Sequence, residues 1–320
     1  MKNIAVVGLG NIATRHRRNL KILFPQVKVY ALSASGRNIT GSVSDCDEIA
    51  NSIEQLIGLV DMAIIASPAT KHAEHAIPFI AANIPVLIEK PIVGSLEDAQ
   101  CLLEASRKYK TPLAVGYCLR YLPSARVTQQ ALAEELAGQL LNARISIGQY
   151  LPDWRTTKDY RDSVSASKLL GGGALLELSH EFDYARWMLG ELQVHNAIIR
   201  NSGTLDIEVE DLVDVVAMTN QQAVVHIHLD FLQRKVHRHC DFIGTKGRIE
   251  WDLILNQVLL HTAEGTEILY SDAAYDKNGM YLDMLRDFTQ YIAERPHQCI
   301  LVDDAVATIG LIENIKSVAI

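Results

Sequence analysis

Acidic residues are missing from the start of the chain: no aspartate or glutamate occurs before Asp45, although the 320 residues carry a formal net charge of -8. A net acidic chain lacks the basic face that nucleic acids and anionic membranes require. No apolar run approaches the roughly 18 residues that span a bilayer, and the N-terminus lacks the layout of a signal peptide. We therefore expect a cytoplasmic protein that binds neither nucleic acid nor membrane.

Cysteine is also scarce. The five cysteines are scattered along the chain, an odd number with no Cys-x-x-Cys pair. This pattern favours reduced thiols over a disulfide framework or a zinc site. Hydrophobic residues make up 48% of the chain and charged residues 21%, as is typical of a globular protein. The length suffices for one large or two ordinary domains.

The first third of the chain alternates short apolar runs with helical patterns. We predict strands at Ile4–Val7, Val27–Leu32, Met62–Ala66, Val86–Glu89 and Leu113–Val115, separated by helices near Ile12–Leu23, Thr70–Ala82 and Leu96–Tyr109. Strands that are apolar on both faces and separated by helices predict a parallel sheet covered on both sides. Residues 1–118 are therefore predicted to form a doubly wound, dinucleotide-binding α/β domain.

After Gly116 the pattern changes. We predict helices at Pro123–Leu136, Gly171–Met188, Tyr281–Ala293 and Ala305–Ile320, and a strand at Leu140–Gln149. Alternation between residues 211 and 258 predicts antiparallel sheet with one packed face. Residues 119–320 are therefore expected to form a second domain that binds substrate and mediates oligomerisation, with a C-terminal helix that packs back on the first. No long linker separates the two domains, and ligand clefts favour such joints.

The spacing Gly8-x-Gly10-x-x-Ala13 follows the first strand and opens a helix, which is the context of a dinucleotide-binding turn rather than of a plain turn. Gly8 makes the tight bend, Gly10 lets the backbone approach the pyrophosphate, and the small Ala13 lets helix and strand pack closely. The phosphates are expected on the helix N-terminus, at Asn11 and Ile12, where N–H groups and the helix dipole favour an anion.

The carboxylate that usually binds the ribose about 20 residues further on is missing. The second strand ends instead in the sequence YALSASGRN, which offers Ser33, Ser35 and Arg37. A carboxylate here would repel a 2′-phosphate, whereas hydroxyls and a guanidinium bind one. We therefore favour NADP over NAD as the cofactor, with Ser33 and Arg37 near the adenosine ribose; the alternative is that NAD binds without the acid.

Three later segments carry motifs in a specific order. ASPATKHAEHAIPFIAANIPVLIEKPI holds Ser67-Pro68, His72 and Glu89-Lys90-Pro91; AVGYCLRYLP holds Tyr117 and Arg120; GGGALLELSHEFD holds Glu177, His180 and Asp183. Together with the glycine turn, these motifs resemble the Gfo/Idh/MocA oxidoreductases, the family of glucose–fructose oxidoreductase and inositol dehydrogenase. The resemblance covers nearly the whole chain.

This resemblance implies an N-terminal Rossmann domain and a C-terminal α+β domain with a large, mostly antiparallel open sheet, through which the chain is expected to form a homodimer or homotetramer. It implies hydride transfer between a nicotinamide and a sugar-like alcohol or carbonyl. Two alternatives stay open: a dinucleotide-binding regulator without catalysis, and an enzyme that uses bound NAD transiently for hydrolysis or epimerisation. Lys90 and His180 argue against the regulator, because a sensor has no chemical need for the pair.

The resemblance also implies catalytic roles. Lys90 matches the family's catalytic-site lysine, and a cation at a strand end of an open α/β sheet can stabilise a developing alkoxide. His180 is the expected acid–base group, because histidine titrates near neutrality, and Asp183 is expected to orient the substrate or the imidazole. Many members place an aspartate four residues before this histidine, whereas here Glu177 lies three before it, so its role at the substrate is open.

Further site residues are expected around these. Ser67, Pro68 and His72 are expected along the cofactor crevice, with Glu89 and Lys90 near the nicotinamide. By the resemblance, Tyr117 and Arg120 edge the substrate cleft, although Arg120 fits an internal pair with a carboxylate equally well.

The loop between residues 151 and 168 carries aromatic and basic side chains: Trp154, Arg155, Tyr160, Arg161 and Lys168. An aromatic ring can stack on a sugar, and an arginine fork binds carboxylate or phosphate. The loop therefore favours a sugar with an anionic substituent, such as an acidic or nucleotide-linked sugar; subunit contacts explain these residues equally well.

The segment VVHIHLDFLQRKVHRHC suggests a metal site. His226 and His228 share one strand face, as do His237 and His239, and facing positions on a hairpin could bring these imidazoles together. Zinc binds imidazoles readily, yet no carboxylate or cysteine framework in the sequence completes a catalytic site, and hydride transfer to a nicotinamide needs no metal. We predict a polar outer face of the sheet or an oligomer surface, and no metal.

Overall fold

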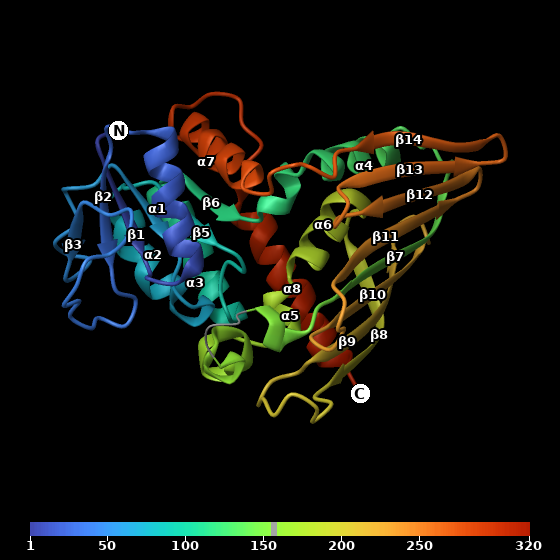
Figure 1. The fold of residues 1–320 in the computed structure, drawn as a ribbon, viewed down its shortest axis with the longest axis horizontal. Helices are drawn as coiled ribbons and strands as arrows, with labels where there is room; N and C mark the ends of the chain where they lie inside the picture. The colour runs from blue at the N-terminus through green and yellow to red at the C-terminus, as the bar shows by residue number, and fades with distance from the viewer. Residues whose placement is uncertain (155–158) are drawn as a thin grey trace. The chain divides into compact units, whose positions relative to one another are not determined.

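The computed structural model describes residues 1–154 and 159–320. By its contacts the described chain divides into two compact units, Met1–Cys118 with Asn278–Ile309 and Leu119–Lys277 with Gly310–Ile320. Figure 1 labels most of the helices and strands of both units. The segment Asn278–Ile309, which the sequence analysis assigns to the second domain, belongs by its contacts to the first unit.

Within the described residues, the first unit is built on a seven-stranded sheet. Its strands are β1 (Asn3–Val7), β2 (Lys28–Leu32), β3 (Glu48–Ala50), β4 (Met62–Ile65), β5 (Val86–Glu89), β6 (Leu113–Gly116) and β15 (Ile300–Leu301), in the order β15-β6-β5-β4-β1-β2-β3. The pairs are parallel apart from the antiparallel pair of β15 with β6. This order confirms the predicted doubly wound plan.

Helices accompany this sheet at the predicted places. They are α1 (Asn11–Leu23), α2 (His72–Ala81), α3 (Leu96–Tyr109), α7 (Gly279–Ile292) and the first part of α8 (Val302–Val318). Local chemistry sets the ends of α3: the Ser95 hydroxyl accepts the Asp98 N–H at 3.1 Å, and Lys110 adopts the left-handed conformation that ends the helix. Helix α1 packs against α7, and α2 against α3.

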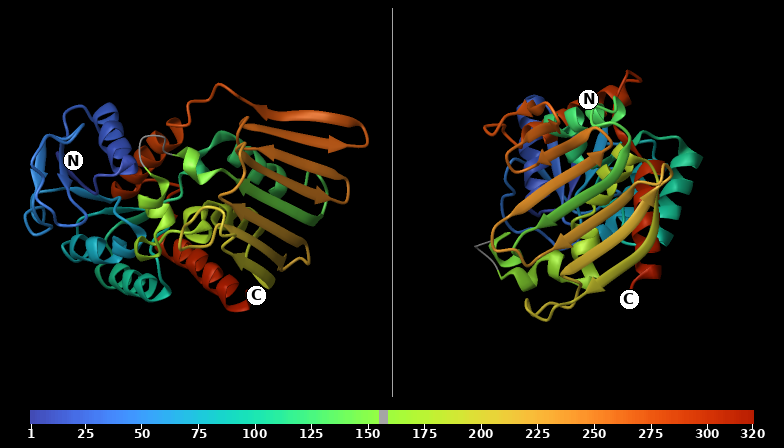
Figure 2. Two further views of the ribbon diagram at one scale, coloured as in Figure 1. Left: turned by 60° about the horizontal axis from the view of Figure 1, so that its bottom comes forward. Right: turned by 90° about the vertical axis from the view of Figure 1, so that its right-hand side faces the viewer.

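Within the described residues, the second unit is built on an eight-stranded sheet, in the order β14-β13-β12-β11-β7-β10-β9-β8. Its strands are β7 (Leu140–Gly148), β8 (Leu192–Arg200), β9 (Leu212–Thr219), β10 (Val224–Asp230), β11 (His237–Gly244), β12 (Gly247–Asp252), β13 (Gln257–Thr262) and β14 (Gly265–Ser271). Neighbours are antiparallel except β10 with β7. Figure 2 shows these strands side by side.

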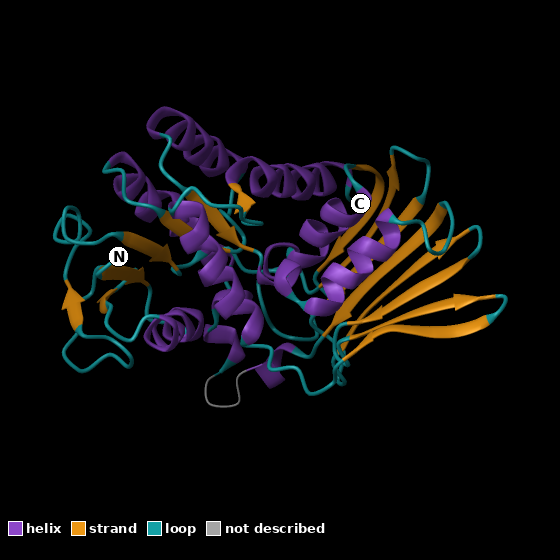
Figure 3. Ribbon diagram, turned by 90° about the horizontal axis from the view of Figure 1, so that it is seen from above, coloured by secondary structure: helices purple, strands orange, loops and turns teal. Residues whose placement is uncertain are grey.

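Helices pack on one face of this second sheet. Helix α4 (Pro123–Ala133) contacts β12 and β13, α6 (His180–Leu189) contacts β7, and the short α5 (Ala174–Glu177) contacts β9 and β10. Along β9, Val213 and Val215 are buried while Asp214 and Val216 are not, which is the alternation of a sheet with one covered face. The other face is open (Figure 3). The structure confirms the predicted large, mostly antiparallel open sheet.

Two local predictions in this unit differ from the structure. The continuous helix predicted over Gly171–Met188 is wrong, because the chain forms α5 and α6 with a break at Leu178 and Ser179. The glycines precede α5 instead of lying in a helix: Gly173 has a φ of +99°, and a Cβ there would lie 2.3 Å from Oε1 of Glu210. Strand β8 was not predicted.

Neither membrane-spanning helices nor disulfides are found among the described residues. No helix there is both long enough and apolar enough to cross a bilayer. All five cysteines are free thiols, as expected from their odd number and spacing.

Candidate active site

The glycine turn lies where β1 meets α1. Gly8 has a φ of +125°, and a Cβ there would come within 2.3 Å of the Ala66 carbonyl oxygen, so only glycine fits. Gly10 is the N-cap of α1, and a Cβ added there would have no other atom within 4 Å, so the space beside this backbone is open. The helix begins at Asn11 with no acidic residue in its first turn and no side-chain cap. Its first N–H groups are therefore suited to an anion such as a pyrophosphate.

A buried arginine that the sequence analysis missed lies beneath this turn. Arg17 donates through Nη1 to the Gly8 carbonyl oxygen at 3.2 Å and through Nε to that of Ser44 at 2.9 Å. Burial lowers the pKa of this guanidinium. Ala13, Arg17 and Leu20 are all buried, and this spacing of four and three residues could have shown that Arg17 faces inward. Arg17 joins the glycine turn to the loop after β2.

The loop after β2 has the composition predicted for the adenosine end. Ser33 follows β2 directly and is buried, with Oγ 3.2 Å from Oγ of Ser35, whereas Arg37 is exposed. The first carboxylate in the sequence, Asp45, lies 3.6 Å from Nε of Arg18. The segment next to the end of β2 therefore presents hydroxyls and a guanidinium where a ribose-binding acid usually lies.

A histidine joins the segment after β4 to the segment after β5. His72, buried at the start of α2, has Nδ1 3.0 Å from the Pro91 carbonyl oxygen and Nε2 2.8 Å from that of Ser67. Burial lowers the pKa of this imidazole. One turn later, Nδ1 of His75 lies 2.9 Å from the Ser67 hydroxyl. Both ring nitrogens of His72 are thus engaged within the unit, and the ring shapes the loop that holds Ser67 and Pro68.

Strand β5 ends at Glu89, and Lys90 follows it. The Glu89 carboxylate is buried, lies 2.6 Å from Nε2 of His16 and accepts the backbone N–H of Lys90 at 3.2 Å. The Lys90–Pro91 peptide bond is cis, and Lys90 itself is partly exposed. Because β1, β4 and β5 are parallel, the glycine turn, Ser67 and Lys90 lie along one edge of the sheet.

In the second unit, His180 is the first residue of α6 and is buried. Glu177 ends α5, on the other side of the break, and its Oε2 accepts the Ser165 hydroxyl at 2.8 Å. Glu177 and His180 therefore do not share a helix face, in contrast to the arrangement that a continuous helix would give.

Asp183, three residues into α6, is held by an arginine. Arg120 donates through Nε to Oδ2 at 2.9 Å and through Nη2 to Oδ1 at 2.6 Å, and both side chains are largely buried. The guanidinium also lies 5.6 Å from the centre of the Trp187 ring. Of the two interpretations of Arg120, the internal pair with a carboxylate is therefore the one that the structure contains.

Most of the other predicted substrate residues are engaged within the protein. Tyr117 is fully buried. Trp154 packs edge-on against Phe231, with ring centres 5.3 Å apart, and Tyr160 donates its hydroxyl to the Leu205 carbonyl oxygen at 2.6 Å. Arg155 lies outside the described residues.

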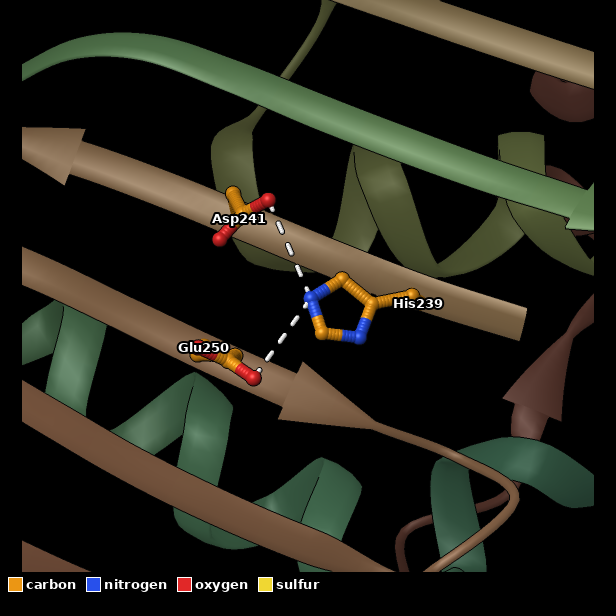
Figure 4. Close-up of side chains that lie close together, drawn as sticks. All are labelled: His239, Asp241 and Glu250. Atoms are coloured by element: carbon orange, nitrogen blue, oxygen red, sulfur yellow. Dashed lines mark ion pairs between the residues drawn. The ribbon is translucent and has the colours of Figure 1, made fainter. Parts of the chain in front are cut away.

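The histidine-rich segment does not bring its imidazoles together across a hairpin. Strand β7 lies between β10, which carries His226 and His228, and β11, which carries His237 and His239. Instead, Nε2 of His239 lies 3.8 Å from Asp241 and 3.9 Å from Glu250 of the neighbouring strand β12 (Figure 4).

Carboxylates therefore do accompany one of these histidines, contrary to the expectation from the sequence. The ligand atoms of His239, Asp241 and Glu250 lie close enough together to hold a metal ion. However, Arg248 donates to Asp241 at 2.7 Å and to Glu250 at 2.8 Å, so both carboxylates are already bound to its guanidinium. We interpret the cluster as an ion-pair network on the open face of the sheet.

His228 predicts a pH dependence of stability. Hydrogen bonds to Asp230 at 2.9 Å and Asp214 at 2.7 Å raise the pKa of this imidazole to about 9. Because the pKa is raised on folding, the stabilisation is complete below the unfolded value of about 6.5 and is lost as the pH rises through about 9. We expect a loss of about 1 kcal/mol, after allowance for solvent screening. Urea unfolding below and above this pH window measures the loss in the free energy of unfolding. His228→Gln should abolish this loss. An equal loss in that variant would contradict the assignment to His228.

A separate cavity of about 400 Å³ lies in the second unit. It is lined by the end of α4 and the segment after it, the end of α6, and the turn after β9, with Glu135 as its acidic residue. None of the predicted site residues lines it, so we do not place the reaction there.

Solved structures with the same fold are known. Levoglucosan dehydrogenase, in complex with NADH and levoglucosan, matches with a TM-score of 0.84 at 17% identity over 99% of this chain and 96% of that chain. GenD2 from gentamicin A biosynthesis, in complex with NAD, matches with a TM-score of 0.80 at 23% identity over 99% and 93%. At these identities the likeness concerns the fold.

Relatives are also found by sequence. The rhizopine catabolism protein MocA of Rhizobium meliloti is 27% identical over 59% of this chain and 57% of its own length. The 1,5-anhydro-D-fructose reductase of Ensifer adhaerens is 28% identical over 70% and 68%. The myo-inositol 2-dehydrogenase of Thermotoga maritima is 24% identical over 90% and 87%. The match to MocA therefore spans little more than half of that protein.

Two models of protein families match this chain. The model for the oxidoreductase family with NAD-binding Rossmann fold matches residues 2–117, and that for the GFO/IDH/MocA C-terminal domain matches residues 126–250. One match lies in each structural unit, and together they cover most of the chain. The protein therefore belongs to the Gfo/Idh/MocA family of NAD-binding oxidoreductases.

Proposed function

We propose that this protein transfers hydride between a nicotinamide cofactor and the alcohol or carbonyl carbon of a sugar derivative in the cytoplasm. The proposal rests on one observation: Gly8, Ser67 and Lys90 lie together at the carboxyl ends of the parallel strands β1, β4 and β5 of the first sheet. In open α/β sheets, dinucleotides bind outside the carboxyl ends of the strands. Lys90 supplies a cation on this edge.

The residues divide the chemistry between them in this proposal. Lys90 stabilises negative charge on the reacting oxygen. His180 accepts the hydroxyl proton during oxidation and returns it during reduction. Asp183 is bound to Arg120 through both carboxylate oxygens, so we assign it to positioning α6 rather than to proton transfer.

Sugars and polyols are the proposed substrates. The names of the relatives support this class, since they include an anhydrofructose reductase and an inositol dehydrogenase. An acidic or nucleotide-linked sugar is the second candidate. The loop gives this candidate less support than the sequence suggested, because the guanidinium of Arg161 already binds the Asp159 carboxylate. This contact lowers the pKa of Asp159 to about 2.

A substrate panel tests the proposal. Purified protein is incubated with NAD or NADP and with inositols, anhydro sugars, hexoses, uronic acids and sugar nucleotides, and the nicotinamide absorbance is followed. We expect net absorbance change with a sugar or polyol, abolished in His180→Ala. Cofactor binding without any turnover would favour the regulator, and product formation without net absorbance change would favour the NAD-assisted hydrolase or epimerase.

We propose a preference for NADP over NAD, which rests on Ser33 and the exposed Arg37 after β2. Arg37→Ala is expected to weaken NADPH binding by about tenfold, because a charge-assisted contact to the 2′-phosphate is lost, and to leave NADH binding nearly unchanged. Fluorescence titration with both cofactors measures this. Arg18→Ala, an exposed arginine of α1, serves as the control for general charge effects. If Arg37→Ala weakens the binding of NADPH and NADH equally, the proposed contact between Arg37 and the 2′-phosphate is wrong.

We also propose that the open face of the second sheet joins copies of this chain into a homodimer or homotetramer. Exposed Ile198 and Val216 lie there, and Ile198 is opposite Asp214, which forms an ion pair with His228. A symmetry-related copy can therefore bury the apolar residues and pair the charges. Val216→Arg is expected to lower the mass measured by light scattering. Ile22→Arg, on an exposed position of α1, should leave it unchanged. A monomeric wild-type protein would refute this.

A further inference from the structure

A buried hydrogen-bonded pair joins the helix that follows the glycine turn to the strand that ends before Lys90. His16 on α1 is 0% exposed, and its Nε2 lies 2.6 Å from Oε1 of Glu89, which is 5% exposed at the end of β5. A carboxylate removed from water needs hydrogen-bond donors or a cation. His16 supplies a donor that comes from another element of the same unit.

The same carboxylate contacts the backbone at the catalytic lysine's position. Oε2 of Glu89 accepts the N–H of Lys90 at 3.2 Å. On the neighbouring strand, Gly116 pairs with Glu89, and a Cβ there would lie 3.1 to 3.2 Å from the carboxylate atoms. The Glu89 side chain thus fills the space over Gly116, and both β6 and His16 confine it.

The surroundings keep this pair out of water. The His16 ring meets Tyr281 of α7 edge-on, with ring centres 6.3 Å apart at 77°. The Arg15 guanidinium lies 4.6 Å from the centre of the same tyrosine ring. Burial raises the pKa of the Tyr281 phenol. A hydrogen bond in such an environment is worth more than one at the surface, and its loss removes the donor at Oε1 of a buried carboxylate.

We propose that His16 is a positioning residue for Lys90. It holds Glu89, and Glu89 holds the backbone of Lys90, so the helix that opens at the glycine turn is bonded to the strand end that carries the ammonium group. The pair thereby sets the place of Lys90 relative to a dinucleotide on α1. A displacement of about 1 Å in such a group can lower turnover by about 100-fold. This inference rests on the proposed role of Lys90.

Three variants separate positioning from general stability. His16→Leu removes the donor. His16→Gln retains one, because its amide nitrogen lies the same number of bonds from Cα as Nε2 of histidine. Asn19→Leu is the matched control. Asn19 lies on the same helix and is also buried, but its hydrogen bonds of 2.9 and 3.2 Å join it to Asn278, the N-cap of α7, and not to Glu89.

Two measurements are made on each folded variant. The rate at which trinitrobenzenesulfonate labels Lys90 in the NADH-bound protein, followed by peptide mass spectrometry, reports the lysine's placement without any turnover. The kcat and the cofactor KM are measured with the panel substrate of highest activity. For His16→Leu we expect the labelling rate to change at least about threefold and kcat to fall about 10- to 100-fold, with the cofactor KM within about twofold. His16→Gln should restore most of the wild-type labelling rate and kcat, and Asn19→Leu should match the wild type in both quantities.

The outcomes distinguish this inference from the proposed function. Unchanged labelling and kcat in His16→Leu, or equal losses in Asn19→Leu, would overturn the positioning role. In a Lys90→Ala background, His16→Leu should cause no further loss of kcat, and a further loss of the same size would also overturn it. If His16→Leu does not fold, Glu89→Gln decides by the same labelling measurement. If Lys90→Ala itself retains turnover, the proposed role of Lys90 fails while the proposed hydride transfer stands, and the labelling result still tests the placement of Lys90.

Discussion

Replacing Lys90 by alanine is expected to lower turnover by at least about 100-fold, the range for a group that stabilises charge on a reacting oxygen. NADH binding should remain within about threefold of wild type, because the pyrophosphate is expected on α1 rather than on β5. Steady-state kinetics with the active panel substrate and a fluorescence titration with NADH measure the two effects.

Lys71→Ala is the control for this prediction. Lys71 is an exposed lysine of the same unit, paired with Glu74 at 2.7 Å, and its loss should leave kcat unchanged. Near-normal turnover in Lys90→Ala would remove the lysine from the mechanism. Loss of NADH binding together with turnover would instead place Lys90 in the cofactor site alone.

Asp183→Ala is expected to lower the free energy of unfolding by about 3 to 5 kcal/mol, because it leaves the guanidinium of Arg120 buried without its carboxylate. The side chains are 1% and 11% exposed, and the pair is bidentate. Replacing both residues, as in Asp183→Leu with Arg120→Met, should recover much of this loss, since no lone charge then stays buried. Urea unfolding of the three variants measures the coupling.

The matched control is the exposed pair of Arg107 and Asp303. Its N–O distance of 3.0 Å is also that of a hydrogen bond, but its side chains are 68% and 67% exposed. Asp303→Ala should change the free energy of unfolding by less than about 1 kcal/mol. If Asp183→Ala costs no more than this control, the buried pair does not stabilise α6, and Asp183 is better assigned to the substrate.

The parts of the fold that could be predicted are those encoded by local spacing. The turn at Gly8 was predicted from three small residues at fixed offsets, and the positive φ and the close approach to Ala66 explain why glycine is required. The strands of the first sheet are short apolar runs, so their burial on both faces appears directly in the sequence. Strand β3 has only three residues, too few for a pattern.

Other parts could not be predicted because their cause is not local. The apolar pattern from residue 171 to 188 fits one helix, yet the helix is interrupted at Leu178 and Ser179. Likewise, the two histidine pairs at 226–228 and 237–239 fit a hairpin, but β7 inserts between their strands. Strand β7 comes from an earlier part of the chain, with Asn142 paired to Val224, and it leaves no trace in the sequence of either neighbour.

By itself, the sequence determined the dinucleotide turn, the doubly wound sheet and the family of this protein, because each depends on residue types at short, regular spacings. Only the tertiary structure decided which polar groups meet. Arg120 binds Asp183 across 63 positions, and His16 reaches Glu89 across 73. No periodicity encodes such pairs, because the partners come together only when the chain folds. The free-energy cost of burying an unpaired charge then exceeds the local conformational preferences of the residues, and it determines which groups pair.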